Sequence, residues 1–132
     1  MPSDGPMWAR ELLAQVYADV GRDDLPTLGW QERANYGARI TGRTWSEENR
    51  IHISVGNRTH RKDQHYILLH EIAHALLPSG EHHSERFWTL AFMLYIRYGA
   101  DVQHAYACEI KYRKAAGRGY GNACRLLGKD GK

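Results

Sequence analysis

The stretch DQHYILLHEIAHALL, residues 63–77, is the most informative segment of this 132-residue chain. Its apolar residues recur at helical spacing, Asp63 can cap its start, and Pro78 can end it, so the pattern predicts a helix over about residues 63–77. Within this helix, His70 and His74 stand four residues apart and therefore share one face. Two imidazoles at this spacing can bind one metal ion from the same side.

Glu71 follows the first histidine and is expected to project toward the same cleft without binding the metal. Zinc lowers the pKa of a bound water toward ~7, and a carboxylate beside that water can accept its proton. We therefore expect Zn²⁺ at His70 and His74, with Glu71 as the general base. The alternative is an ordinary exposed polar face on an amphipathic helix. In both cases the core side would be formed by Leu68, Leu69, Ile72, Ala73 and Leu76.

A catalytic zinc needs a third protein ligand and an open fourth position. The candidates follow the helix after a short turn: they are Glu81, His82, His83 and Glu85. The spacing alone leaves the choice among these four open.

The flanking sequence predicts an α+β fold. Alternating apolar residues indicate a β-hairpin or a three-stranded meander over about residues 28–55. Apolar residues at helical spacing, with glycines or capping residues at the ends, predict three further helices. These helices are expected over about residues 6–20, 84–98 and 101–116.

The metal segment resembles the SprT-like zinc metallopeptidases. In that family a helix bearing HExxH is followed by a His-Gly-x-x-Phe or similar motif, and here His83-Ser84-Glu85-Arg86-Phe87-Trp88 stands in its place, with Ser84 where the family has Gly. The resemblance covers about residues 8–100. It implies His83 as the third ligand and a small gluzincin-like domain over residues 1–116. Such a domain has an N-terminal helix, a short antiparallel sheet, the HExxH helix and C-terminal helices.

A looser resemblance links the chain to ImmA/IrrE-like peptidases, whose third ligand is usually Glu. Aligning Phe87 with the Phe of that family again puts His83 near the ligand position, and a histidine there favours the SprT-like assignment. SprT proteins often carry a cysteine-rich zinc ribbon, which Cys108 and Cys124 cannot form alone. We expect these two cysteines to be unlinked thiols.

These resemblances imply a zinc metallopeptidase that cleaves peptide bonds by Glu71-assisted attack of zinc-bound water. An extended protein or peptide substrate is expected to pair with the hairpin edge near residues 50–55. One alternative is an amidohydrolase-type enzyme acting on a small substrate. Another is a DNA- or protein-binding regulator with a structural zinc, which would not need Glu71.

The charge is unevenly distributed along the chain. Residues 111–132 hold seven Lys or Arg and one acid, which predicts a flexible basic tail over residues 117–132. Because SprT-like proteases act on DNA-bound proteins, we expect at most weak, non-specific DNA association through this tail. Residues 1–5 lack the features of a secretory signal, and no apolar run approaches the ~20 residues of a membrane helix. A cytoplasmic location without membrane contact is therefore expected.

Overall fold

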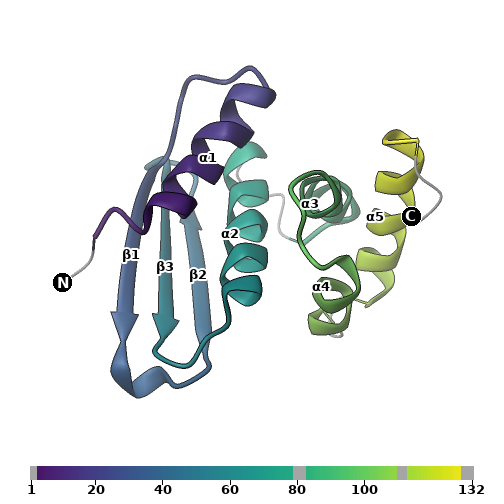
Figure 1. Ribbon diagram of the computed structural model, residues 1–132. Coiled ribbons are helices and arrows are strands. Elements are labelled where there is room, and N and C mark those ends of the chain that lie inside the picture. Colours follow the sequence, from purple (N-terminus) through teal and green to yellow (C-terminus); the bar gives the residue numbers. More distant parts are fainter. Residues whose placement is uncertain (1–2, 79–82, 110–112, 129–132) are drawn as a thin grey trace. The chain divides into compact units, whose positions relative to one another are not determined.

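The computed structural model describes residues 3–78, 83–109 and 113–128. Over these residues the chain forms five α-helices and one three-stranded sheet, which confirms the α+β class (Figure 1). It divides into two compact units, Met1–Leu76 and Leu77–Lys132. None of the described helices is both long and apolar enough to cross a lipid bilayer.

The first unit contains the sheet and two helices. In chain order its elements are α1 (Met7–Asp19), β1 (Thr27–Arg33), the 3-10 helix η1 (Ala34–Tyr36), β2 (Ile40–Trp45), β3 (Arg50–Gly56) and α2 (Arg61–Leu76). The helix predicted over 63–77 thus begins two residues earlier, and Asp63 lies in its first turn instead of capping it.

The sequence analysis predicted an antiparallel sheet, but the observed sheet is mixed. Its order is β1-β3-β2, with β3 parallel to β1 and antiparallel to β2. A tight turn containing Asn49, whose φ is +50°, makes β2 and β3 a hairpin. The chain places β1 on the other side of β3, so the three strands do not form a meander.

Because of this strand order, the free edge of the sheet is not where the sequence predicted it. The central strand β3 has neighbours on both sides, so residues 50–55 cannot accept an added strand as the sequence predicted. The β1 edge is bridged at Trp30, which exchanges two backbone hydrogen bonds with Ser3. Among the described residues, no strand pairs with the outer edge of β2, which leaves that edge open to an extended chain.

The two faces of the sheet differ in character. One face packs against the helices, with α2 in contact with β2 and β3, and it carries Leu28, Trp30, Ile51 and Ile53, all buried. Because side chains alternate along a strand, the residues between them point to the opposite face. That second face is polar, and it includes Arg43, Arg50 and His52.

The second unit is helical. Its elements are α3 (Glu85–Arg97), α4 (Val102–Cys108) and α5 (Arg113–Leu126). Side chains cap the first two helices, since Ser84 accepts a hydrogen bond from the Phe87 N–H and Asp101 accepts one from the His104 N–H. The segment predicted as one helix over residues 101–116 contains α4 and the beginning of α5.

Helix α5 lies where the sequence predicts a flexible tail, and it packs against α3. Ala116 and Ala123 are fully buried. A Cβ atom at Gly119 would lie 2.5 Å from the carbonyl carbon of Trp88, so the glycine allows the two helix backbones to approach closely. The cysteines Cys108 and Cys124 form no disulfide with each other, which confirms that they are unlinked.

Candidate metal centre

Helix α2 presents two histidines on adjacent turns. His70 is 8% exposed, and its ring centroid lies 5.1 Å from that of His74. A third ring, that of Tyr66, stands edge-on to His70 with centroids 6.1 Å apart. The helical spacing predicted from the sequence therefore brings the two imidazoles together as expected.

His83 lies immediately before α3, in an unusual backbone conformation. Its φ is +42°, a region that non-glycine residues rarely adopt and that is over-represented at functional sites. Its ring stacks on Trp88, with centroids 5.6 Å apart and 25° between the planes, and meets Phe87 edge-on at 5.2 Å. Two buried aromatic rings of α3 thus fix the orientation of this imidazole.

The three histidines supply a set of ligand atoms suited to a metal ion. His70, His74 and His83 each offer one ring nitrogen, and these three atoms lie within 4.8 Å of one another. Three neutral imidazoles are a ligand set that zinc accepts, with a further position left for water or substrate. These three residues could therefore hold a divalent metal ion.

Of the other candidates for the third ligand, Glu81 and His82 lie outside the described residues. The carboxylate of Glu85 is already bound within the second unit. It accepts hydrogen bonds from Arg118 at 2.6 Å and from Asn122 at 3.2 Å, so it anchors α5 to the first turn of α3. These interactions explain Glu85 without a metal.

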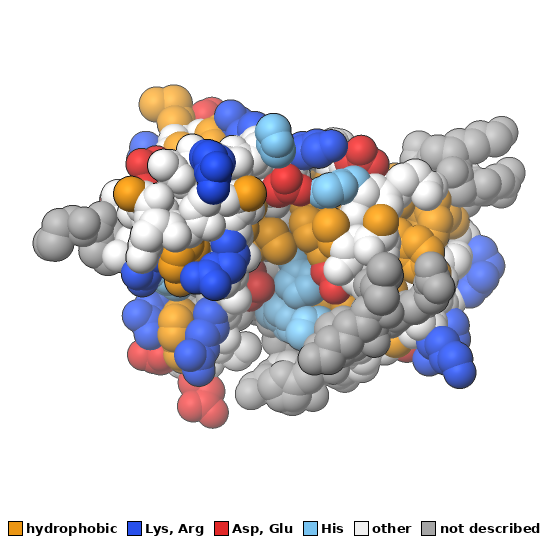
Figure 2. All heavy atoms as spheres, turned by 90° about the horizontal axis from the view of Figure 1, so that it is seen from below, with side chains coloured by type: hydrophobic (Ala, Val, Ile, Leu, Met, Phe, Trp, Pro, Cys, Tyr) orange, Lys and Arg blue, Asp and Glu red, His pale blue; other side chains and the backbone are white. Residues whose placement is uncertain are grey.

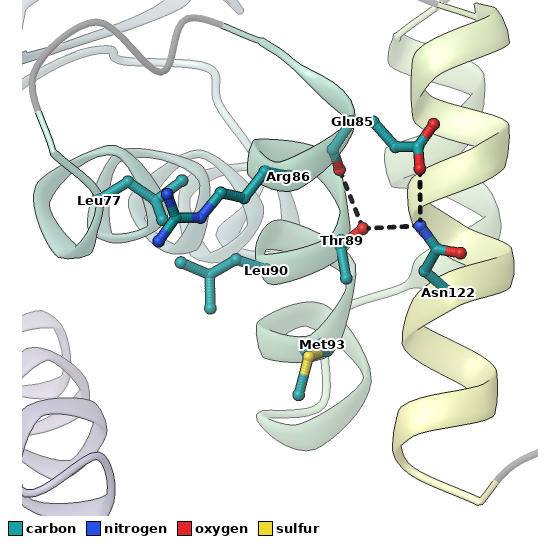
Figure 3. Close-up of a pocket in the computed structure, with 7 residues that line it drawn as sticks. All are labelled: Leu77, Glu85, Arg86, Thr89, Leu90, Met93 and Asn122. Atoms are coloured by element: carbon teal, nitrogen blue, oxygen red, sulfur yellow. Dashed lines mark hydrogen bonds between the residues drawn. The ribbon is translucent and has the colours of Figure 1, made fainter.

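Figure 3 shows a pocket of the second unit that Glu85, Thr89 and Asn122 help to line. Asn122 also donates a hydrogen bond to the Thr89 hydroxyl at 3.1 Å, and that hydroxyl donates to the backbone carbonyl of Glu85 at 2.9 Å. Next to these groups, Leu90 and Met93 help to line a pocket of about 420 Å³. None of the histidines of the metal group lines it.

Glu71 is buried, whereas the alternative of an ordinary polar helix face would leave it exposed. Its side chain is 6% exposed and is directed at strand β2. The Thr44 hydroxyl lies 2.7 Å from Glu71 Oε1 and 3.1 Å from the Glu71 backbone carbonyl, both of which can accept its proton. Burial raises the pKa of the Glu71 carboxyl to about 7, while the hydrogen bond from Thr44 acts in the opposite direction.

Space for this carboxylate comes from a glycine in the same strand. A Cβ atom at Gly42 would lie 2.7 Å from Cγ of Glu71 and 2.9 Å from its Oε2. Gly42 and Thr44 are two residues apart and thus lie on the same face of β2, the face toward α2. One residue admits the carboxylate and the other donates a hydrogen bond to it.

The motif search in the sequence pointed to neither Thr44 nor Gly42, because neither end of β2 carries a clear signal. The alternation of Ile40, Gly42 and Thr44 was the available clue, together with the rule that a glycine inside a strand often marks a close approach by another group.

The arrangement combines a buried carboxylate with three clustered imidazoles. Glu71 is adjacent in sequence to His70 on α2, and its carboxylate is held by a single strand of the first unit. Such a combination could bind a metal ion and move a proton beside it. The chain matches no protein-family model, and comparisons with curated proteins and with solved structures also give no match.

Proposed function

We propose that the chain is a zinc-dependent hydrolase, and most specifically a metallopeptidase. The observation that carries the proposal is the environment of Glu71. A buried carboxylate is costly unless it has a function or a strong partner. Its side chain accepts a hydrogen bond from one neutral hydroxyl of the described residues, that of Thr44, and Glu71 directly follows His70 of the metal group.

In this proposal His70, His74 and His83 would hold the metal. A zinc ion there would supply a Lewis acid and would lower the pKa of water toward ~7. Glu71 accepts a proton from the attacking water and delivers it to the leaving amine. Burial raises the pKa of the Glu71 carboxyl, and the positive charge of a bound metal ion would act in the opposite direction.

The free edge of β2 supports a peptide as the substrate. The carboxylate of Glu71 contacts Gly42 and Thr44 of this strand, so a chain paired along the outer edge of β2 would run close to the general base. Main-chain hydrogen bonds to an edge strand give affinity for extended peptides of varied sequence. A small-molecule amidohydrolase would make no use of this edge.

The test compares the wild type with Glu71→Gln and with Glu11→Gln, a control at an exposed residue of α1. Metal content is measured by elemental analysis after growth with zinc, and hydrolysis is measured on an unfolded protein, a mixed peptide library and simple amides. We expect about one zinc in all three proteins and a loss of about 100-fold or more in peptide hydrolysis only in Glu71→Gln.

Three results would contradict the proposal or its assignment to peptides. Equal hydrolysis by wild type and Glu71→Gln would show that the activity does not use this carboxylate. Zinc binding without hydrolysis of any peptide or amide would favour the alternative of a regulator with a structural metal. Hydrolysis of simple amides but not of peptides would favour the small-substrate alternative.

A further inference from the structure

The polar face of the sheet carries two stacks of arginine on aromatic rings. In the first, the guanidinium of Arg50 lies 4.0 Å from the centre of the Trp45 ring, and that of Arg43 lies 5.0 Å from it. Arg43 and Trp45 are two residues apart on β2, and Arg50 is paired with Trp45 on β3. All three side chains therefore project from the face that α2 does not cover.

The second stack lies at the other end of β2. Arg39 stands 4.1 Å and Arg33 stands 5.2 Å from the centre of the Tyr36 ring. Arg33 belongs to β1 and also donates a hydrogen bond to Gln31 at 2.9 Å. From Arg39 to Trp45 the chain advances six residues, which corresponds to about 20 Å of extended strand.

The surface between the two stacks is small and polar. It includes Thr41 of β2 and two residues of β3, His52 and Ser54. The Ser54 hydroxyl oxygen lies 3.3 Å from Nε2 of His52. Burial, and then the positive charges of Arg33 and Arg50, lower the pKa of His52. The arginines thus produce a positive potential along this face.

Among the ion pairs of the described residues, one joins an acidic residue to these stacks. Glu48 lies 3.4 Å from Arg50, but both side chains are close to half exposed. An exposed ion pair of this kind contributes ~0–1 kcal/mol, so a phosphate could displace Glu48. Figure 2 shows several Lys and Arg side chains, interspersed with hydrophobic ones, on the surface of the sheet unit.

We infer that this face, defined by Arg33, Tyr36, Arg39, Arg43, Trp45 and Arg50, binds single-stranded nucleic acid. The four arginines complement the phosphates, and the aromatic rings and guanidinium planes offer surfaces on which unpaired bases stack. A length of about 20 Å suits roughly four nucleotides, the lower end of the site sizes of single-strand-binding folds. This inference does not depend on the proposed hydrolase activity.

The same features disfavour a duplex or a membrane. Bases within a duplex are stacked on each other, so their faces are not accessible to Trp45 or Tyr36. Insertion into a lipid surface needs exposed aliphatic groups. The exposed large hydrophobic residues of the described chain lie elsewhere: they are Met7, Val20, Leu25 and Leu126.

The experiment measures binding of the full chain to a labelled single strand of about 12 nucleotides by fluorescence anisotropy at two salt concentrations. It compares the wild type with the double variant Arg43→Gln/Arg50→Gln and with Trp45→Leu. The control is Arg10→Gln/Arg97→Gln, which removes the same charge from exposed positions outside this face. A matched duplex and vesicles containing phosphatidylserine are tested in parallel, and circular dichroism checks that each variant is folded.

We expect Arg43→Gln/Arg50→Gln to weaken single-strand binding about tenfold at low salt and to reduce the salt slope by about 1.4, the value for two lost phosphate contacts. Trp45→Leu should weaken binding with little change in slope, and the control should stay within about twofold of wild type. The inference would be overturned if both double variants lost the same amount of single-strand affinity. It would also be overturned if the wild type did not bind the single strand at low salt, or bound the duplex equally well. Vesicle binding that depends on Arg43 and Arg50, without single-strand binding, would assign the face to a membrane instead.

Discussion

The carboxylate of Glu71 occupies the space that a side chain at residue 42 would fill, because a Cβ atom on Gly42 would lie 2.7 Å from Glu71 Cγ. Gly42→Ala should therefore push the carboxylate aside, and the displacement is easy because Glu71 is a flexible side chain. We expect the variant to fold and to keep its metal. Its peptide hydrolysis should fall about 100-fold, the cost of moving a reacting group by about 1 Å.

Thr41→Ala is the matched control for this change, since Thr41 is the neighbouring residue on the opposite, exposed face of β2. It should retain wild-type hydrolysis. Full activity in Gly42→Ala would mean that the position of the Glu71 carboxylate does not matter for the reaction, and the general-base assignment would then be wrong.

Thr44 offers a second test, one that separates a positioning role from a structural one. Thr44→Val keeps the shape of the side chain but removes the donor that lies 2.7 Å from Glu71 Oε1. Loss of one hydrogen bond to a charged group costs about 1.5–3 kcal/mol, so kcat should fall roughly tenfold to a hundredfold while KM changes little. Thr44→Ser restores the hydroxyl and should recover most of kcat. If Thr44→Ser were as impaired as Thr44→Val, the effect would come from packing.

Gly42 and Thr44, set beside the histidines of α2, show which parts of the site the sequence could predict and which it could not. The pattern of His70, Glu71 and His74 is local to one helix, so 3.6-residue periodicity was enough to bring the two imidazoles together. The environment of Glu71 depends on which strand lies beside α2 and on which face of that strand is inward. That information is non-local, because it follows from the mixed pairing of three strands.

The metal group predicts an asymmetry between adjacent histidines. His83 belongs to the three-nitrogen group, and its ring is held by Trp88 and Phe87, so His83→Ala should lower zinc affinity about 100-fold or more. His82→Ala and His104→Ala should lower it much less. The measurement is competition with a chromogenic chelator. Loss of zinc in His82→Ala with retention in His83→Ala would show that the ligand register is wrong by one residue.

The stability of the protein should depend on pH through Glu109, at the C-terminal end of α4. Burial raises the pKa of its carboxyl from 4.5 to about 7 in the folded state. Below pH 4.5 the group is neutral in both states and costs nothing. Between pH 4.5 and 7 the unfolded chain releases the proton first, so the free energy of unfolding falls, and above pH 7 the loss is complete.

Glu109→Gln should remove this part of the pH dependence. The variant should match the wild type near pH 4 and be more stable than the wild type at pH 8, because it has no carboxylate to bury. Urea unfolding at the two pH values measures both free energies. Identical pH dependence in the two proteins would show that the Glu109 carboxyl titrates alike in the folded and unfolded states.

Helix α5 was the element that the sequence least revealed, because Gly117, Gly119 and Gly121 lower helix propensity and suggested a loose tail. The structure gives one of these glycines a packing role. A Cβ atom at Gly119 would lie 2.5 Å from the Trp88 carbonyl carbon and 2.7 Å from the Thr89 nitrogen. Since both atoms belong to the backbone of α3, they cannot move aside as a side chain would.

Gly119→Ala should therefore force the two helices apart and lower the free energy of unfolding by about 2–3 kcal/mol. Gly121→Ala is the matched control, because the nearest atom to its Cβ would be the end of the Arg125 side chain at 3.7 Å. That substitution meets no obstacle and improves helix propensity, so it should raise stability by about 0.5–1 kcal/mol. Opposite signs in urea unfolding would establish that α5 is packed on α3 in solution. Stabilisation by both substitutions would instead indicate an isolated helix, and no effect of either substitution would indicate the loose tail that the sequence predicted.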